Sequence, residues 1–532
     1  MIDLNQDNNQ KREPLGYLWA TWVSRALCLF FVSLVMLVGG YIGGVALHDP
    51  DTCFLLAMGR WIADHHSLPL HDPFSYTAPV LGSTLVVYQW LSELIMYQVY
   101  KFTELNGILI LVSVMISIAF IMLPLRILMR STIPLVLALF LVSLGTMAAS
   151  LHFLARPEIF SYFCLALWIE RICGWLEKES PVFRELMFFT ITTIIWCNLH
   201  SGFVLGILLL MLIGLTSILT RNKKNDASLT RRGRTCLLMA GVSMFASLIN
   251  PWGIELWSYL PKLFFLAANK YIVELQPFTG SDLSHPEFYP YILLNVISLL
   301  LIWKCWRSGF NFSQTAGLVL MIAAITLGIM AHRLIPFAIL LTFGALRLLF
   351  WQEILSPAKK LDGNSWMKLT DDHLKKIIQP ASLLWNSMLI MPAVFGALLV
   401  MTVVVQPRLP QSSAAFQPPT AAIQFLKHHL PKGRVFNDPE FGDLMQYYLY
   451  PLARVFIDTR FDMYGTTFIE DYLKTDRCLS GWHQVLKQRD IDWIFIPPTD
   501  PVAIALASDP GWLTVYADRQ AVIMIKQLDP KK

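Results

Sequence analysis

Residues 203–220 read FVLGILLLMLIGLTSILT, an apolar run without a charged side chain. About 20 such residues in a helix cross the hydrocarbon core of a bilayer. Eleven apolar runs recur along the chain, near 22–47, 108–126, 132–151, 157–174, 186–200, 203–220, 235–251, 288–303, 313–331, 334–350 and 383–405. The sequence therefore predicts a mainly α fold, a polytopic helical membrane bundle of about 11 spans.

The composition supports a membrane protein and argues against a nucleic-acid-binding one. The 532 residues are 55% hydrophobic and 15% charged, whereas about a quarter of the residues of a soluble protein are charged. The net charge of +5 is modest, and the basic residues cluster in short loops, which is typical of membrane topology. No nucleic-acid motif is present.

Lysine and arginine in short loops indicate which side of the membrane is cytosolic. Such basic loops occur at 221–234, at Arg126 and Arg130, at Lys304 and Arg307, and at 352–376. If the polar N-terminus is cytosolic and the first run is a retained anchor, all four loops fall inside. The chain from about Gln406 then falls outside. An amphipathic stretch, 86–102, is assigned to the outer interface in this topology.

Two domains follow from the change in composition near residue 406. Residues 1–405 form the membrane domain, with a first outer loop at 48–83, and residues 406–532 form a small C-terminal α/β domain. Prolines mark the linker, and strand-like and helix-like segments then alternate. The expected helices are 420–429 and 440–449, and the expected strands are 434–437, 454–458, 492–496, 512–516 and 521–525.

The first outer loop carries two carboxylates one residue apart, Asp49 and Asp51. One interpretation makes Asp51 or Thr52 the cap of a short helix over 52–64. The other makes the pair a general base, or a site for an oxygen-liganded divalent cation such as Mg²⁺ or Mn²⁺. The pattern Asp-x-Asp alone does not decide between them.

Further ionisable residues fall on the same predicted outer face. Arg156 with Glu158, and His332 with Arg333, each stand where an apolar run begins. A guanidinium there suits the phosphate of a lipid, which it binds bidentately, although snorkelling to lipid headgroups explains either arginine alone. The remaining outer candidates are His71, Asp72 and His200, and the loop acids and histidine Glu255, Glu274, Asp282, His285 and Glu287.

In the C-terminal domain the segment Asp458-Thr-Arg460-Phe-Asp462 follows an expected strand, where α/β proteins often place functional residues. Asp458 and Arg460 are candidates for binding an acceptor or supporting the membrane site, together with Asp438, Glu440 and Asp443. The structural alternative is an ion pair of Arg460 with Asp458 or Asp462. The cysteines lack a metal-binding spacing, and Cys53 and Cys478 are expected to be inert rather than paired.

The order of several short motifs resembles a known group of membrane enzymes. These motifs are Asp49-Pro-Asp51-Thr, Gly59-Arg-Trp-Ile62, Asp72-Pro-Phe-Ser-Tyr-Thr77, Trp90-Leu-Ser-Glu93, Arg156-Pro157, Asn250-Pro-Trp-Gly253, and Val455-Phe-Ile-Asp458 with Arg460 and Tyr464. The chain is similar to the GT-C fold glycosyltransferases, which include oligosaccharyltransferase catalytic subunits and protein mannosyltransferases, and especially to a bacterial branch of GT-C-like proteins.

This resemblance implies a catalytic carboxylate in the first outer loop, here Asp49 or Asp51, and basic residues that hold a lipid phosphate, here Arg156 and Arg333. It also implies a polyprenyl-phosphate-linked sugar as donor. The branch has two tryptophans and a histidine after Asp-Pro-Asp-Thr, but this chain has Cys53, Phe54 and Leu55. The missing histidine argues against a metal role and favours the alternative of an inactive scaffold.

The sequence thus predicts a glycosyltransferase of the bacterial inner membrane that works on the periplasmic face. Its acceptor is a glycan, a lipid or a protein, and its N-terminus is cytoplasmic. In this hypothesis Asp51 or Asp49 takes a proton from the acceptor hydroxyl while the arginines stabilise the departing phosphate. The alternatives are a non-catalytic transporter of a lipid-linked saccharide and an inactive scaffold of envelope glycan assembly.

Overall fold

A computed structural model of the protein describes residues 49–78, 85–131, 133, 135–177, 181–219, 227–264, 272–308, 312–349 and 418–527. Two of the expected spans, 22–47 and 383–405, and the boundary expected near residue 406 lie outside the described residues. The total of about 11 spans and the division into two domains therefore stay predictions.

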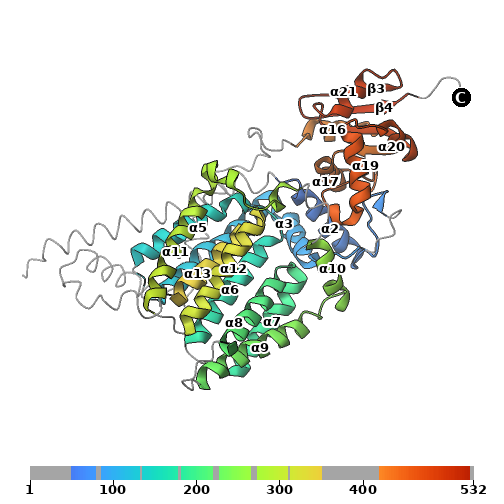
Figure 1. Ribbon diagram of the computed structural model, residues 1–532. Helices are drawn as coiled ribbons and strands as arrows, with labels where there is room; N and C mark the ends of the chain where they lie inside the picture. Colours follow the sequence, from blue (N-terminus) through green and yellow to red (C-terminus); the bar gives the residue numbers. More distant parts are fainter. Residues whose placement is uncertain are drawn as a thin grey trace, which may run out of the picture.

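A bundle of long helices forms most of the described chain, and the C-terminal part sits against one end of it (Figure 1). The helices are α3 Trp90–Ile116, α4 Leu123–Met129, α5 Leu135–Ala149, α6 Glu158–Glu177, α7 Val182–Leu199, α8 Phe203–Leu219, α9 Ala227–Ala246, α11 Tyr289–Ser308, α12 Phe312–Met330 and α13 Ile335–Leu349. Within the described ranges, four helical segments are long and apolar enough to cross a membrane: Trp90–Met129, Glu158–Glu177, Val182–Leu199 and His332–Leu349.

The amphipathic stretch 86–102 forms the first part of a kinked helix, and its place in the outer interface stays a prediction. From Trp90 it belongs to α3, which continues through the π-helical segment η2 Ser117–Met122 into α4. The helix is interrupted at Glu104, whose φ of 54° and ψ of −149° are not helical. The sequence pattern separated 86–102 from 108–126 because it changes from amphipathic to apolar close to this interruption.

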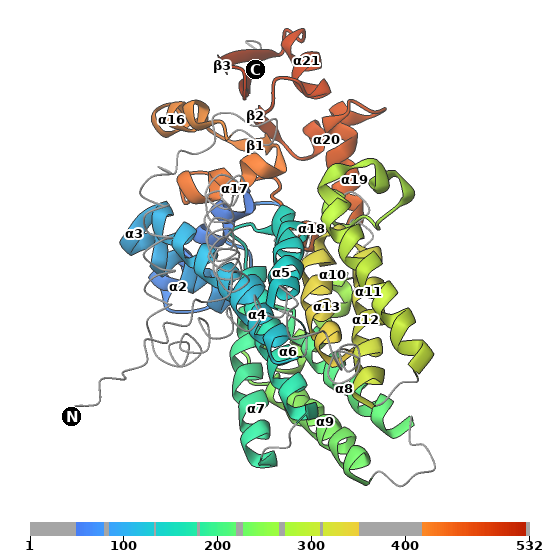
Figure 2. The same cartoon turned by 90° about the vertical axis from the view of Figure 1, so that its left-hand side faces the viewer.

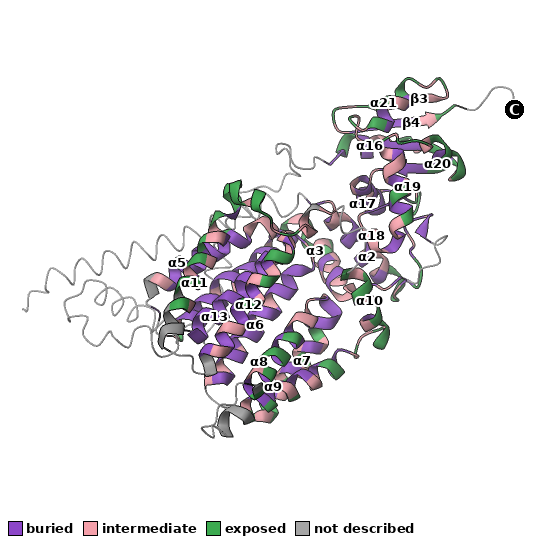
Figure 3. Cartoon of the chain, viewed as in Figure 1, coloured by how far each residue is buried: buried purple, intermediate pink, exposed green. Residues whose placement is uncertain are grey.

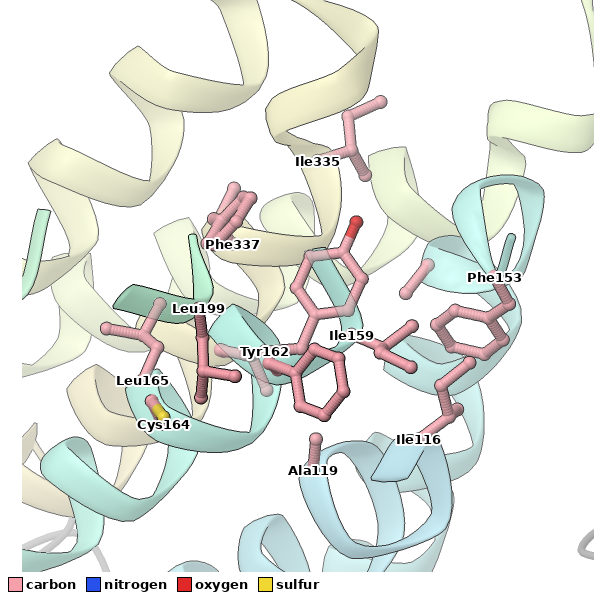
Figure 4. Packing of buried hydrophobic residues seen from close by; sticks show 14 of the residues in the cluster. Ile116, Ala119, Phe153, Ile159, Tyr162, Cys164, Leu165, Leu199, Ile335 and Phe337 are labelled. Atoms are coloured by element: carbon pink, nitrogen blue, oxygen red, sulfur yellow. The ribbon is translucent and has the colours of Figure 1, made fainter. Parts of the chain in front are cut away.

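Burial divides the bundle into a central and a peripheral part (Figure 3). Every residue of α13 is buried, whereas α7, α8 and α9 expose large apolar side chains such as Ile195, Met211 and Phe245. Helices that expose apolar side chains on one side suit contact with lipid. At the centre, the Tyr162 ring packs against Phe337, with ring centroids 4.9 Å apart (Figure 4). It also contacts Phe120, with ring centroids 5.5 Å apart.

Short elements connect the bundle helices at the end that faces the C-terminal part (Figure 2). They are α2 Asp51–His65, η3 Ser150–His152, α10 Ile254–Phe264, η5 Val273–Leu275, η6 Gly280–Ser284, η7 Pro286–Phe288 and η8 His332–Leu334. Helix α2 matches the helix expected over 52–64 within the first outer loop, but its N-cap is Pro50, and the Asp51 N–H donates to Asp49 Oδ1 at 3.3 Å. The capping role considered for Asp51 or Thr52 is therefore wrong.

The C-terminal part contains a mixed four-stranded sheet with the order β1-β2-β4-β3. Its strands are β1 Arg434–Asn437, β2 Ile491–Ile496, β3 Trp512–Ala517 and β4 Val522–Lys526, and its helices are α16 Thr420–His428, α17 Pro439–Tyr448, α18 Phe461–Tyr464, α19 Thr466–Asp476, α20 Trp482–Gln488 and α21 Pro501–Ala507. Only β1 and β2 pair in parallel; the other two contacts are antiparallel. The expected strands 434–437, 492–496, 512–516 and 521–525 correspond to these four.

The expected strand at 454–458 is wrong, because this segment does not join the sheet. Val455 instead forms an isolated parallel bridge with Ser75 of the first loop. The Val455 N–H donates to the Phe74 carbonyl at 2.9 Å, and the Thr77 hydroxyl donates to the Phe456 carbonyl at 2.6 Å. The strand-like residues of this segment therefore attach the C-terminal part to the first loop.

Helices α2 and α3 cross closely at Gly59, which leads to a stability prediction. A Cβ atom at Gly59 would overlap the Glu93 carbonyl and lie 2.7 Å from Tyr97 Cβ. Overpacking of this kind costs about 1–3 kcal/mol, so Gly59→Ala should lower the melting temperature of the purified protein. Gly174 of α6, which has no neighbouring heavy atom within 4 Å of such a Cβ, is the matched control. A Gly59→Ala protein as stable as Gly174→Ala would contradict the close crossing.

Candidate active site

The predicted outer residues approach one another where three helices begin. Asp49 and Asp51 lie at the start of α2, Arg156 precedes α6, and Arg333 lies in η8 just before α13. The Thr52 hydroxyl donates to the Ala155 carbonyl at 3.4 Å, which fixes the start of α2 beside the turn that carries Arg156. Residues far apart in the sequence thereby share one site.

Arg156 lies at the centre of three carboxylates. Its Nη2 donates to Asp49 Oδ1 at 2.8 Å and its Nε also binds Asp49. The same Nε is 3.2 Å from Asp51 Oδ2, and Nη1 donates to Glu274 Oε2 at 3.0 Å. All three guanidinium nitrogens are therefore engaged, and only 14% of the side chain is exposed.

Arg333 is the more accessible of the two guanidinium groups. Its Nη2 pairs with Glu158, and its Nη1 lies 4.0 Å from Glu274 Oε2. Glu274 therefore stands between Arg333 and Arg156. The Arg333 side chain is 31% exposed, so Arg333 keeps more capacity than Arg156 to receive an incoming anion.

Asp51 differs from Asp49 in accessibility. The Asp51 side chain is 22% exposed, whereas that of Asp49 is 2% exposed and bound by two nitrogens of Arg156. Burial raises the pKa of Asp51 to about 6, assisted by the charge of Asp49 and opposed by Arg156 and Arg333. Asp51 is therefore a carboxylate whose proton affinity suits exchange near neutral pH.

The C-terminal part reaches this site through Thr459. The Thr459 hydroxyl donates to Asp443 Oδ2 at 2.8 Å and also interacts with the Asp51 carboxylate. Asp443 is buried in α17, and burial, followed by the charges of Asp51 and Asp458, raises its pKa well above the ordinary value. Asp51 therefore lies where the bundle and the C-terminal part meet.

A buried ion-pair triad holds these two parts together. Arg460 Nη1 lies 2.9 Å from Asp72 Oδ1 of the first loop, and Nη2 lies 2.6 Å from Asp458 Oδ2. Asp458 also accepts hydrogen bonds from Gln446 at 2.6 Å and from Tyr464 at 2.8 Å. The expected alternative, an ion pair of Arg460 with Asp458, is present, and Asp72 is the additional partner.

The histidine candidates lie outside this group of contacts. His332 Nε2 is 3.4 Å from Asp282 Oδ2, and its ring packs 5.1 Å from that of Phe288. His200 Nδ1 hydrogen-bonds with the Ser161 hydroxyl at 2.8 Å, and burial lowers the pKa of His200 to about 4. His71 is exposed. Each of the three stays a predicted binding residue without a contact to Asp51.

The sequence names Asp443 as a candidate for supporting the membrane site and Glu274 as one of several loop acids, but it does not single out Thr459. Glu274 has no diagnostic spacing, and Thr459 has no feature that distinguishes it from other threonines. All three reach the site by contacts across more than a hundred residues of sequence or between separate elements. A pattern of local spacing carries no signal for such contacts.

The carboxylates do not fit a divalent cation as they are arranged. Within the described ranges, no three His, Cys, Asp or Glu side chains form a group that could hold a metal ion. Arg156 already fills the space between Asp49, Asp51 and Glu274. Leu55, which stands where the resembling branch has a histidine, is 1% exposed and packs in the hydrophobic core.

Comparison with known proteins assigns the fold to a class. No protein-family model matches the sequence, and no curated protein matches it. The fold is similar to that of solved oligosaccharyltransferase structures, and the chain is a multi-pass membrane protein.

The structural similarity is to the oligosaccharyltransferase AglB of Archaeoglobus fulgidus. The structure of AglB with an inhibitory peptide and a dolichol-phosphate superposes with a TM-score of 0.51 and 10% identity. The crystal structure of the apo form of the Archaeoglobus fulgidus oligosaccharyltransferase gives 0.50 and 13%. Each comparison covers 88% of this chain and 69% of the other. At such identity the similarity concerns the fold.

Proposed function

We propose that the protein is a glycosyltransferase that moves a sugar from a polyprenyl-phosphate-linked donor to an acceptor hydroxyl on the extracytoplasmic face of the bacterial inner membrane. The observation that carries the proposal is the cluster of contacts in which Asp51 lies 3.2 Å from Arg156, while Glu274 lies 3.0 Å from Arg156 and 4.0 Å from Arg333. AglB, which has the same fold, has been solved with a dolichol-phosphate.

In the proposed reaction Asp51 is the general base. It takes the proton of the acceptor hydroxyl, whose oxygen forms a bond to the anomeric carbon of the donor sugar while the bond from that carbon to the phosphate oxygen breaks. Arg333 stabilises the negative charge that develops on the departing polyprenyl phosphate. Arg156 is a positioning residue that holds Asp49 and orients Asp51.

Asp51 is favoured over Asp49 as the base because its carboxylate is accessible. The second function considered, a scaffold without turnover, was suggested by the change to Leu55. The burial of Leu55 in the core weakens that argument, because an apolar side chain at this position packs well without occupying the contacts of Asp51.

The proposal is tested by the glycans of cells that carry the protein, cells that lack it, and cells that carry Asp51→Asn. Mass spectrometry should find the lipid-linked saccharide accumulated, and the mature envelope glycan depleted, both without the protein and with Asp51→Asn. Identical glycans in all three strains would contradict a transferase. If the glycans change without the protein but are normal in cells that carry Asp51→Asn, the result would instead support the scaffold.

The pH dependence of transfer follows from the pKa of Asp51. A general base must be ionised, and burial raises the pKa of this carboxyl to about 6. The value of kcat/KM should therefore fall about tenfold per pH unit below pH 6 and level off above about pH 7. Residual activity of Asp51→Asn should lack this inflection. A flat wild-type profile between about pH 5 and pH 8 would contradict the role of Asp51.

A further inference from the structure

The Arg156 guanidinium has an unusual set of partners. Asp49, Asp51 and Glu274 come from the start of α2 and from η5, and every one of them places a carboxylate oxygen within 3.2 Å of a guanidinium nitrogen. The side chain is 14% exposed. Carboxylate oxygens are the donor type that hard divalent cations prefer, and here they surround a guanidinium.

The positive charge among these carboxylates belongs to Arg156, which is a side chain of the protein itself. The guanidinium is planar, keeps its charge at any physiological pH and offers five N–H donors to the surrounding oxygens. The charges of Asp49 and Asp51 overcome the effect of burial and raise the pKa of Arg156 well above its ordinary value. Arg156 therefore cannot leave or lose its charge, whereas a bound metal ion can dissociate.

We propose that Arg156 takes the place of a divalent cation in this site, so that Asp49 and Asp51 are organised by a guanidinium and the reaction requires no metal there. This proposal rests on the proposed function only where turnover is concerned. Its structural part, that the carboxylates are already neutralised by Arg156, holds for any reaction at the site.

A consequence is that removal of Arg156 should create a metal site. Arg156→Ala leaves three carboxylates around an emptied volume, with Arg333 as the remaining nearby cation, at 4.0 Å from Glu274. As placed, the three side chains do not form a metal-binding group, so an entering divalent cation must draw them together, and relief of their mutual repulsion in the absence of the guanidinium favours its entry. The wild-type protein has no such vacancy between these carboxylates, because the guanidinium contacts all three.

The test is Mn²⁺ binding to purified wild-type protein and Arg156→Ala, measured by the loss of the free Mn²⁺ signal in electron paramagnetic resonance. We expect Arg156→Ala to bind one Mn²⁺ and the wild type to bind at least tenfold more weakly. The double variant Arg156→Ala with Glu274→Gln should bind Mn²⁺ more weakly than Arg156→Ala alone. Arg333→Ala, which keeps Arg156, is the matched control and should not gain a site.

Two outcomes would overturn the proposal. One is tight Mn²⁺ binding by the wild type that is lost in Glu274→Gln, because the carboxylates would then hold a metal beside Arg156. The other is a folded Arg156→Ala that binds no Mn²⁺. If Arg156→Ala does not fold, Arg156→Gln, which preserves amide donors, replaces it, and a rise in its melting temperature with Mn²⁺ is the readout.

Measurement of glycosyl transfer provides a separate test. If the proposed function holds, a chelator should leave wild-type transfer within about twofold of its untreated rate. Loss of transfer with the chelator, restored by Mn²⁺, would contradict the role of Arg156 even if glycosyl transfer itself is confirmed. Absence of any transfer would contradict the proposed function and leave the Mn²⁺ measurements to decide on Arg156, since they need no sugar donor.

Discussion

Asp51→Asn should lower the rate of glycosyl transfer by about 10²–10⁴-fold, the usual contribution of a general base. The asparagine amide has nearly the shape of the aspartate carboxylate, but it cannot take the proton from the acceptor hydroxyl. Asp51 makes one contact of 3.2 Å with Arg156, which keeps its stronger contacts with Asp49 and Glu274. The measurement is kcat in a transfer assay with purified protein and lipid-linked donor.

Asp49→Asn is the matched control, because it removes the same charge two positions earlier in the chain and a different result is expected for it. Asp49 is bound by two nitrogens of Arg156 and is almost fully buried. Its loss leaves a buried guanidinium with fewer partners, so the melting temperature should fall together with activity. Asp51→Asn should lose activity at an unchanged melting temperature. A wild-type rate in Asp51→Asn would exclude Asp51 as the base.

The helices of the bundle could be predicted from the sequence because each depends on a local property. An apolar run of sufficient length is helical in a membrane whatever its neighbours are. Thus the runs expected at 157–174, 203–220 and 313–331 correspond to α6, α8 and α12. The sequence separates the amphipathic stretch 86–102 from the apolar run 108–126, and the backbone is indeed broken between them, because Glu104 of α3 has non-helical φ and ψ.

The contacts between distant segments could not be predicted. The segment 454–458 has the composition of a buried strand, and it is buried, but it pairs with Ser75 and not with the sheet. Alternation of side chains specifies that a segment is extended and leaves its partner open. The contact of Glu274 with Arg156 could not be predicted either, because it depends on the fold of the loop that carries Glu274.

Several motifs that suggested a catalytic family serve mainly to hold the structure together. The Trp90 indole donates to Asn198 at 2.9 Å, and the Ser92 hydroxyl donates to the Leu199 carbonyl at 2.6 Å. Gly59 permits the close approach of α2 and α3. A short motif in a membrane protein can therefore indicate a helix contact or a catalytic residue. Only the contacts of each side chain in the structure distinguish the two.

Arg460→Met should detach the C-terminal part from the first loop and cost about 3–5 kcal/mol, the usual cost of removing one partner from a buried ion pair. The side chain of Arg460 is 9% exposed, and those of Asp72 and Asp458 are 1% and 0% exposed. Both carboxylates would be buried without a counterion, so each would either stay charged at a cost in stability or take up a proton. Arg460 also covers the Phe54 ring of α2 at 5.0 Å, a contact that methionine preserves only in part.

The expected result is a lower melting temperature and faster proteolysis near residue 418, together with loss of transfer, because Thr459 would no longer be held beside Asp51. Arg434→Met is the matched control: Arg434 pairs with Asp490 at 3.4 Å through side chains that are 53% and 79% exposed, and such pairs contribute about 0–1 kcal/mol. Adding Asp72→Asn and Asp458→Asn to Arg460→Met removes the buried charges and should recover part of the stability. If Arg460→Met were as stable as Arg434→Met, the triad would not be what joins the two parts.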